Sequence, residues 1–192
     1  LSHPFSLAFA FILASWLYQY RREGQAVQER AEAVIALASE QGFPTLLTPG
    51  TMIRGWALAK QGRREEGIEQ MRQGLAASQA TGRGLTRPYH LALLAEAYGE
   101  RGQTEEGLTV LAEALAVVGK TGERYYEAEL YRLKGALMDQ SKTSKQQVEG
   151  KSKTGQDESE ATNTQHLTSS SQAEAEAEAC FHKAIEIARH QQ

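Results

Sequence analysis

The stretch "RGWALAKQGRREEGIEQMRQGL", residues 54–75, decides the fold, because it recurs 40 residues later as "LAEAYGERGQTEEGLTVLAEAL", residues 94–115. The two stretches align without a gap. The residues that recur are Ala57, Gly62, Glu65, Glu66, Gly67 and Leu75, which reappear as Ala97, Gly102, Glu105, Glu106, Gly107 and Leu115. An internal repeat of this length is typical of stacked helical units, each of which buries its apolar face against the next.

Glycines mark the predicted ends of the helices. They fall every 20 residues, and one further glycine precedes them by 18 residues; the marks are Gly24, Gly42, Gly62, Gly82, Gly102 and Gly122. The segments between them have the apolar spacing of amphipathic helices. Glycine ends a helix at little cost because it adopts the left-handed conformation freely. The spacing therefore predicts antiparallel helical hairpins, with Gly24, Gly62 and Gly102 in the turns within hairpins.

Two further glycines lie inside predicted helices, away from their ends. A glycine in a helix interior costs roughly 1 kcal/mol relative to alanine. Gly55 and Gly67 fall where the two helices of one hairpin are predicted to cross. We predict that the absence of a Cβ atom at these positions lets the two backbones approach closely.

Composition indicates a folded chain without a strong electrostatic preference. The 192 residues carry a net charge of −3 and a single cysteine. This charge gives no reason to expect a nucleic-acid partner, and one cysteine excludes an intrachain disulfide framework.

Residues 4–20 hold no charged side chain. We expect them to form a helix buried on most of its surface in a helical stack; a membrane or signal segment is the alternative. Because the chain starts at Leu1, we expect it to be part of a longer protein.

The last predicted hairpin is interrupted. Residues 1–139 contain hairpins 1–3 and the first helix of hairpin 4, and residues 173–192 contain its second helix. Residues 140–172 are rich in Ser, Thr, Gln, Lys and Glu, a composition typical of disorder. We predict a low-complexity disordered insertion there, which is either a regulatory loop or filler.

The helix pattern resembles the tetratricopeptide repeat (TPR). Its first-helix motif corresponds here to Leu91, Leu94, Ala95 and Tyr98, and its second-helix motif corresponds to Ala177, Phe181 and Ala184. The resemblance implies an all-α, right-handed α-solenoid of about four antiparallel helical hairpins. More narrowly, "HPFSLAFA", "EEGLTVLAEALA" and "GERYYEAELYRLKG" resemble the TPR array of large bacterial signalling proteins that carry nucleotide cyclase or regulatory ATPase modules. That resemblance implies a cytoplasmic sensing or docking arm.

A search for chemistry yields no catalytic, cofactor-binding or metal-binding residues. "EGKS", residues 149–152, lacks the first glycine of a phosphate-binding loop. Cys180 and His182 are two residues apart on a predicted helix and therefore face different directions. We expect Cys180 to have a packing role. Glu65 and Glu66 begin a predicted helix, where carboxylates interact favourably with the helix dipole.

The remaining candidate for a functional site is a binding surface. In TPR arrays the first helix of each hairpin lines a groove, and the positions that the resemblance assigns to that groove are Tyr18, Trp56, Lys60, Tyr89, Glu96, Glu129 and Arg132. The alternative for Trp56 and Tyr89 is a place in the core between repeats. We predict a non-catalytic protein–protein interaction or regulatory scaffold whose partner is a protein, a peptide or another domain of the parent chain, with neither nucleic acid nor membrane as partner. A small-molecule-sensing domain is the alternative, and self-association is compatible with both.

Overall fold

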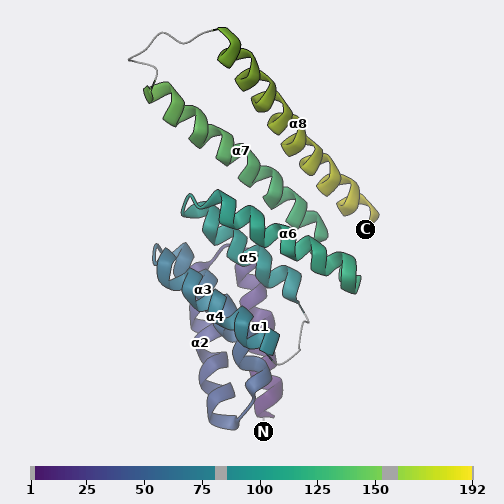
Figure 1. Cartoon of the computed structure of the whole chain (residues 1–192). Coiled ribbons are helices and arrows are strands. Elements are labelled where there is room, and N and C mark those ends of the chain that lie inside the picture. Colours follow the sequence, from purple (N-terminus) through teal and green to yellow (C-terminus); the bar gives the residue numbers. More distant parts are fainter. Residues whose placement is uncertain (1–2, 81–85, 153–159, 192) are drawn as a thin grey trace. The chain divides into compact units, whose positions relative to one another are not determined.

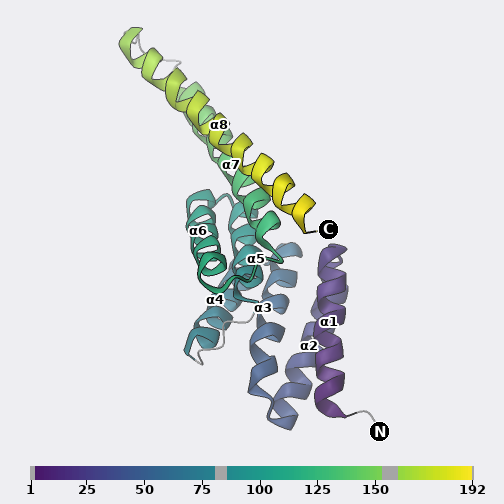
Figure 2. The same cartoon turned by 90° about the vertical axis from the view of Figure 1, so that its right-hand side faces the viewer.

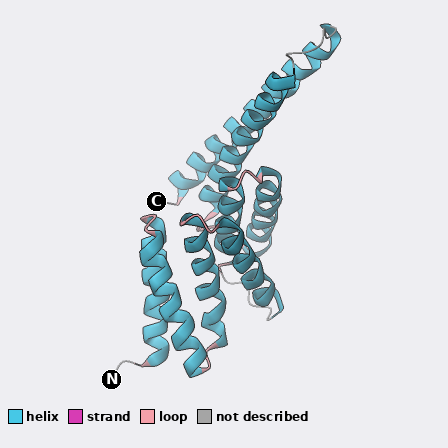
Figure 3. Ribbon diagram, turned by 90° about the vertical axis from the view of Figure 1, so that its left-hand side faces the viewer, coloured by secondary structure: helices cyan, strands magenta, loops and turns pink. Residues whose placement is uncertain are grey.

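The computed structural model describes residues 3–80, 86–152 and 160–191, and within these ranges every regular element is a helix (Figures 1 and 3). The predicted all-α class is therefore confirmed. The helices are α1 (Pro4–Tyr20), α2 (Gly24–Gln41), α3 (Pro44–Lys60), α4 (Arg64–Ala80), α5 (Arg87–Glu100), α6 (Thr104–Thr121), α7 (Glu127–Ser152) and α8 (Glu160–His190).

The chain is divided into two compact units, and the boundary lies between Ala97 and Tyr98, inside α5. In unit 1 each helix packs on the next, α1 on α2, α2 on α3 and α3 on α4, and α1 also packs against α3 (Figure 2). This arrangement is that of successive antiparallel hairpins. The largest fully buried side chains of this unit include Trp56, Tyr89 and Met52.

In unit 2, α6 packs on α7 and α7 packs on α8. Leu111 of α6 and Leu130 of α7 are fully buried. The motif predicted for the second helix of hairpin 4 faces this core, because Ala177 and Ala184 are buried and Phe181 lies against Gly135. A Cβ atom on Gly135 would lie 2.9 Å from the Phe181 ring. Cys180 is a buried free thiol, as its predicted packing role requires.

Four of the six marked glycines adopt the predicted left-handed conformation at the end of a helix. Gly42, Gly62, Gly102 and Gly122 have φ angles of 69°, 90°, 82° and 73°, in the left-handed region. Gly82 lies outside the described residues. The assignment of Gly24 is wrong, because it begins α2 without a positive φ.

Arg22 takes the left-handed conformation in the first turn, with φ 63°. Its backbone N–H donates to the Gln19 carbonyl, and the next N–H donates to the Tyr18 carbonyl. The turns at Gly62 and Gly102 make the same two hydrogen bonds to the equivalent residues. Arg22 is therefore the structural counterpart of Gly62, and the 40-residue period extends to the first hairpin without the two-residue irregularity that Gly24 suggested.

The predicted close approach at Gly55 and Gly67 is confirmed. A Cβ atom added to Gly55 would lie 2.8 Å from the carbonyl oxygen of Gly67. A Cβ atom added to Gly67 would lie 2.7 Å from the backbone nitrogen of Ala59 and closer still to the carbonyl oxygen of Gly55. Real Cβ atoms essentially never approach a heavy atom this closely. Glycine at both positions thus allows α3 and α4 to pack backbone against backbone.

The range predicted as a disordered insertion, 140–172, is described in part as helix, and the insertion itself stays a prediction. Helix α7 continues to Ser152 and α8 already begins at Glu160, so both helices extend into that range. The prediction also falls on residues 153–159, which lie outside the described residues. Gln, Lys and Glu are good helix formers, so a polar composition that lacks a core face is still compatible with helix.

Helix α1 is less buried than expected. It buries Ala8, Ile12, Ser15 and Gln19. Its other side exposes large apolar side chains, so the prediction of a helix buried on most of its surface is wrong for the described chain. No helix among the described residues has the length and apolar character needed to cross a membrane.

Candidate functional site

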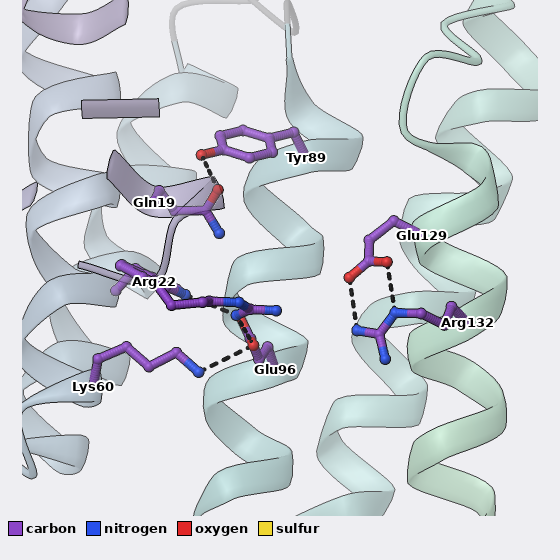
Figure 4. Close-up of polar contacts among 8 residues, drawn as sticks. Gln19, Arg22, Lys60, Tyr89, Glu96, Glu129 and Arg132 are labelled. Atoms are coloured by element: carbon purple, nitrogen blue, oxygen red, sulfur yellow. Dashed lines mark hydrogen bonds and ion pairs between the residues drawn. The ribbon is translucent and has the colours of Figure 1, made fainter. Parts of the chain in front are cut away.

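Glu96 of α5 is the centre of a polar cluster in unit 1. The Trp56 indole Nε1 donates to Glu96 Oε2 over 2.9 Å, and the Lys60 ammonium donates to Glu96 Oε1 over 3.1 Å. The Arg22 guanidinium forms an ion pair with the same carboxylate (Figure 4). We call these four residues, Arg22, Trp56, Lys60 and Glu96, the Glu96 cluster. It joins the first turn, α3 and α5.

Two cations surround the single carboxylate of the cluster. Burial raises the pKa of Glu96, but the Trp56 hydrogen bond and the charges of Lys60 and Arg22 outweigh it and hold the pKa below its usual value. The Lys60 ammonium also lies 5.5 Å from the centroid of the Trp56 ring, a cation–π geometry. Since the Arg22 side chain stays 47% exposed, the cluster presents positive charge to solvent.

The repeat explains why these residues meet. Trp56 and Glu96 are 40 residues apart and so occupy the same position in successive hairpins. Lys60 lies one helical turn beyond Trp56 and therefore on the same face of α3. Arg22 reaches Glu96 from a turn position with a positive φ angle, where a non-glycine residue is uncommon.

A second contact ties α1 to α5 close to the cluster. The Tyr89 hydroxyl donates to Gln19 Oε1 over 3.3 Å (Figure 4). The Tyr89 ring makes an edge contact with the Trp16 ring, with 5.5 Å between the centroids, and a tilted contact with the Tyr20 ring. Both Gln19 and Tyr89 are buried.

The structure brings together only some of the predicted groove residues. Trp56, Lys60 and Glu96 form one cluster, but Trp56 and Tyr89 are each only 1% exposed. They therefore belong to the core of unit 1, which was the alternative interpretation, and neither is an exposed anchor. Tyr18 is partly exposed on α1.

The remaining two predicted residues lie in unit 2. Glu129 and Arg132 pair with each other on α7 through two hydrogen bonds of 2.6 and 2.7 Å (Figure 4). This is a local pair three residues apart on one helix, and such pairs contribute little to stability. Their assignment to a binding surface stays a prediction.

Sequence reasoning missed Arg22 and Gln19. The 40-residue spacing between Arg22 and Gly62 was the available signal, but the glycine at position 24 was more conspicuous. Gln19 carried no signal, because it lies in a segment whose apolar character dominates.

His90, next to Tyr89, is a buried titratable group. Its Nε2 atom has no hydrogen-bond partner in the described structure. Burial, followed by the positive charge of Arg87, lowers the pKa of His90 to about 4. Within the described ranges, no group of three or more His, Cys, Asp or Glu side chains is arranged to hold a metal ion.

Comparisons with known proteins identify the fold. Two crystal structures match the chain, a Podosopora anserina putative kinesin light chain with nearly identical TPR-like repeats and a variant of it. They have TM-scores of 0.59 and 0.58 and 21% identity, and each alignment covers 100% of this chain and 99% of the other. The chain has a TPR-like fold. No family model and no curated protein matches the sequence, so the likeness concerns the TPR-like architecture alone.

We expect Glu96 to stabilise the packing between the TPR-like hairpins. Replacing Glu96→Ala leaves Lys60, Arg22 and the buried indole N–H without their shared acceptor, and should lower the free energy of unfolding of unit 1 by roughly 1–3 kcal/mol. Urea unfolding followed by tryptophan fluorescence measures this. The matched control is Glu66→Ala, since Glu66 forms an exposed pair with Arg63 and should cost about 0.5 kcal/mol. Equal losses in both variants would contradict a special role for Glu96.

Proposed function

We propose that the chain is a non-catalytic protein-interaction module that binds a peptide or another protein domain. The observation that supports this most directly is the TPR-like fold, which is typical of interaction scaffolds. No reacting group is needed for such a role. The side chains that contact the partner include those that the repeat places on the first helix of each hairpin.

The Glu96 cluster is our candidate for the binding surface. Arg22 and Lys60 supply two cations against one carboxylate, and the Arg22 side chain is about half exposed. A partner that carries carboxylates complements this charge. Trp56 contributes by holding Glu96 and Lys60 in place, not by direct contact, because its ring is buried. Tyr18, Glu129 and Arg132 remain further candidates for contacts.

We further propose that the module belongs to a cytoplasmic bacterial signalling protein with a nucleotide cyclase or ATPase module. The sequence resemblance, which covers about residues 1–139 and 173–192, supports this. The alternative is a regulatory domain that senses a small molecule and controls the linked enzyme.

Selection of peptides from a random library on the purified chain tests the interaction role. We expect the selected peptides to be acidic. Arg22→Glu and Lys60→Glu should each weaken the binding of such a peptide at least about tenfold, which corresponds to about 1.4 kcal/mol. Fluorescence anisotropy measures the Kd. The matched control is Arg72→Glu, at an exposed position of α4, which should leave the Kd unchanged.

Two results would contradict this proposal. Unchanged binding in both the Arg22 and the Lys60 variants would show that the cluster is not the binding surface. If no peptide is selected while a metabolite library raises the melting temperature of the chain, the sensing alternative replaces the interaction role.

A further inference from the structure

Helix α1 carries an apolar stripe on its exposed side. Its side chains are Phe5, Phe9, Leu13, Leu17 and Tyr20, with exposed fractions of 39%, 48%, 47%, 58% and 55%. Their spacing of four, four, four and three residues places them on one face of the helix. We call these five residues the α1 stripe. It runs the full length of a helix without a charged side chain.

The exposed area of the stripe is sufficient for a weak, transient contact. Aromatic side chains offer about 150–250 Å² each. With the exposed fractions above, the five side chains present roughly 450 Å² to solvent. An interface that covers this area on two molecules buries roughly 900 Å², close to the ~1,000 Å² at which specific interfaces begin. A patch of this size lies within the range of about 300–600 Å² for the largest apolar patch on a typical monomer, and such patches are often functional.

The spacing of the side chains in the stripe is nearly symmetric about Leu13. Phe9 and Leu17 lie four residues on either side of Leu13, and Phe5 and Tyr20 lie eight and seven residues away. A two-fold interface requires a surface that is complementary to itself. Two α1 helices packed antiparallel about Leu13 place each Phe9 against the Leu17 position and each Phe5 against the Tyr20 position of the other copy.

From this symmetry and area we propose that the occupant of the α1 stripe is a second copy of this chain, in a two-fold dimer centred on Leu13. No like charges oppose the contact, because α1 has none. The side of α1 that carries Ala8 and Ile12 is already buried in unit 1, so the dimer forms without refolding. The modest area makes the dimer weak and reversible. This inference is independent of the function proposed for the Glu96 cluster.

Sedimentation velocity of the purified 192-residue chain, from about 1 to 200 µM, tests the proposal. We expect the monomer to convert to a dimer as the concentration rises. Leu13→Lys, which places two charges opposite each other at the dimer axis, should shift dimerisation to at least about tenfold higher concentration. The matched control is Leu7→Lys, on the same helix but on another face, since Leu7 is 38% exposed and outside the stripe. It should dimerise like the wild type.

A second measurement does not depend on a charged variant. Cys180→Ser removes the single natural thiol, and Leu13→Cys in that background places one thiol at the proposed axis. A short bismaleimide should cross-link the Leu13→Cys chain to a dimer and leave the corresponding Leu7→Cys chain monomeric. The proposal is overturned if the wild type stays monomeric over the whole concentration range. It is also overturned if Leu13→Lys dimerises like the wild type, or if both cysteine variants cross-link equally.

Discussion

Replacing Gly67→Ala is expected to lower the free energy of unfolding of unit 1 by about 3 kcal/mol, the upper part of the range for overpacked sites. The new Cβ atom would lie 2.7 Å from the backbone nitrogen of Ala59 and closer still to the carbonyl oxygen of Gly55. Both are backbone atoms, so no side-chain rotation relieves the overlap. Helices α3 and α4 must separate, and this loss exceeds the roughly 1 kcal/mol that alanine gains in helix propensity.

Gly24→Ala is the matched control for this variant, because Gly24 also lies in a helix of unit 1. A Cβ atom there would meet its nearest neighbour, Lys60 Cβ, at 3.5 Å, an ordinary contact. Its stability should be unchanged or higher by up to about 1 kcal/mol. Both tryptophans, Trp16 and Trp56, are in unit 1, so fluorescence during urea unfolding reports this unit alone. A Gly67→Ala chain as stable as Gly24→Ala would refute the close crossing of α3 and α4.

The second large effect is an acid sensitivity that originates in His90. Its pKa is about 4 in the folded chain, below the ordinary value of 6.5, so the unfolded chain binds the proton more tightly. The stabilisation from neutral His90 is therefore complete above about pH 6.5 and is lost as the pH falls towards 4. Between pH 7.5 and 5.0 unit 1 should lose on the order of 2 kcal/mol.

His90→Leu should remove this dependence, because leucine has no proton to bind in either state. Urea unfolding at a series of pH values from about 7.5 to 5.0 compares it with the wild type. The Glu96 carboxyl does not interfere in this range. Its pKa is lowered in the folded chain, so its stabilisation is complete above its ordinary value of 4.5 and is lost only at lower pH. If both chains lose stability in parallel between about pH 7.5 and 5.0, His90 is not the source.

The features that the sequence predicted well are those set by the backbone. Left-handed turns at Gly42, Gly62, Gly102 and Gly122 follow from what glycine alone does cheaply. The crossing of Gly55 and Gly67 follows in the same way, because a glycine inside a helix lowers its stability unless the missing Cβ atom permits closer packing. Both predictions needed only the repeat and the conformational preferences of one residue type.

The candidate site was harder to predict because it depends on how hairpins are placed against one another. Trp56 and Glu96 were named, but their hydrogen bond across hairpins and the burial of the indole are properties of packing. Arg22 was overlooked because the glycine two residues later fits a turn better by propensity. The extension of α7 beyond residue 139 was missed because a composition with few apolar residues indicates the absence of a core, not the absence of helix.

The contacts that α1 makes with α5 have a consequence for how unit 1 melts. In an ideal repeat array each hairpin touches only its neighbours, so terminal hairpins detach first and unfolding proceeds stepwise from the end. Here Gln19 bonds to Tyr89 and Arg22 pairs with Glu96, two links that pass over the intervening hairpin. The hairpin of α1 and α2 cannot open without breaking these two contacts, so it should unfold together with α5 and not as an independent segment.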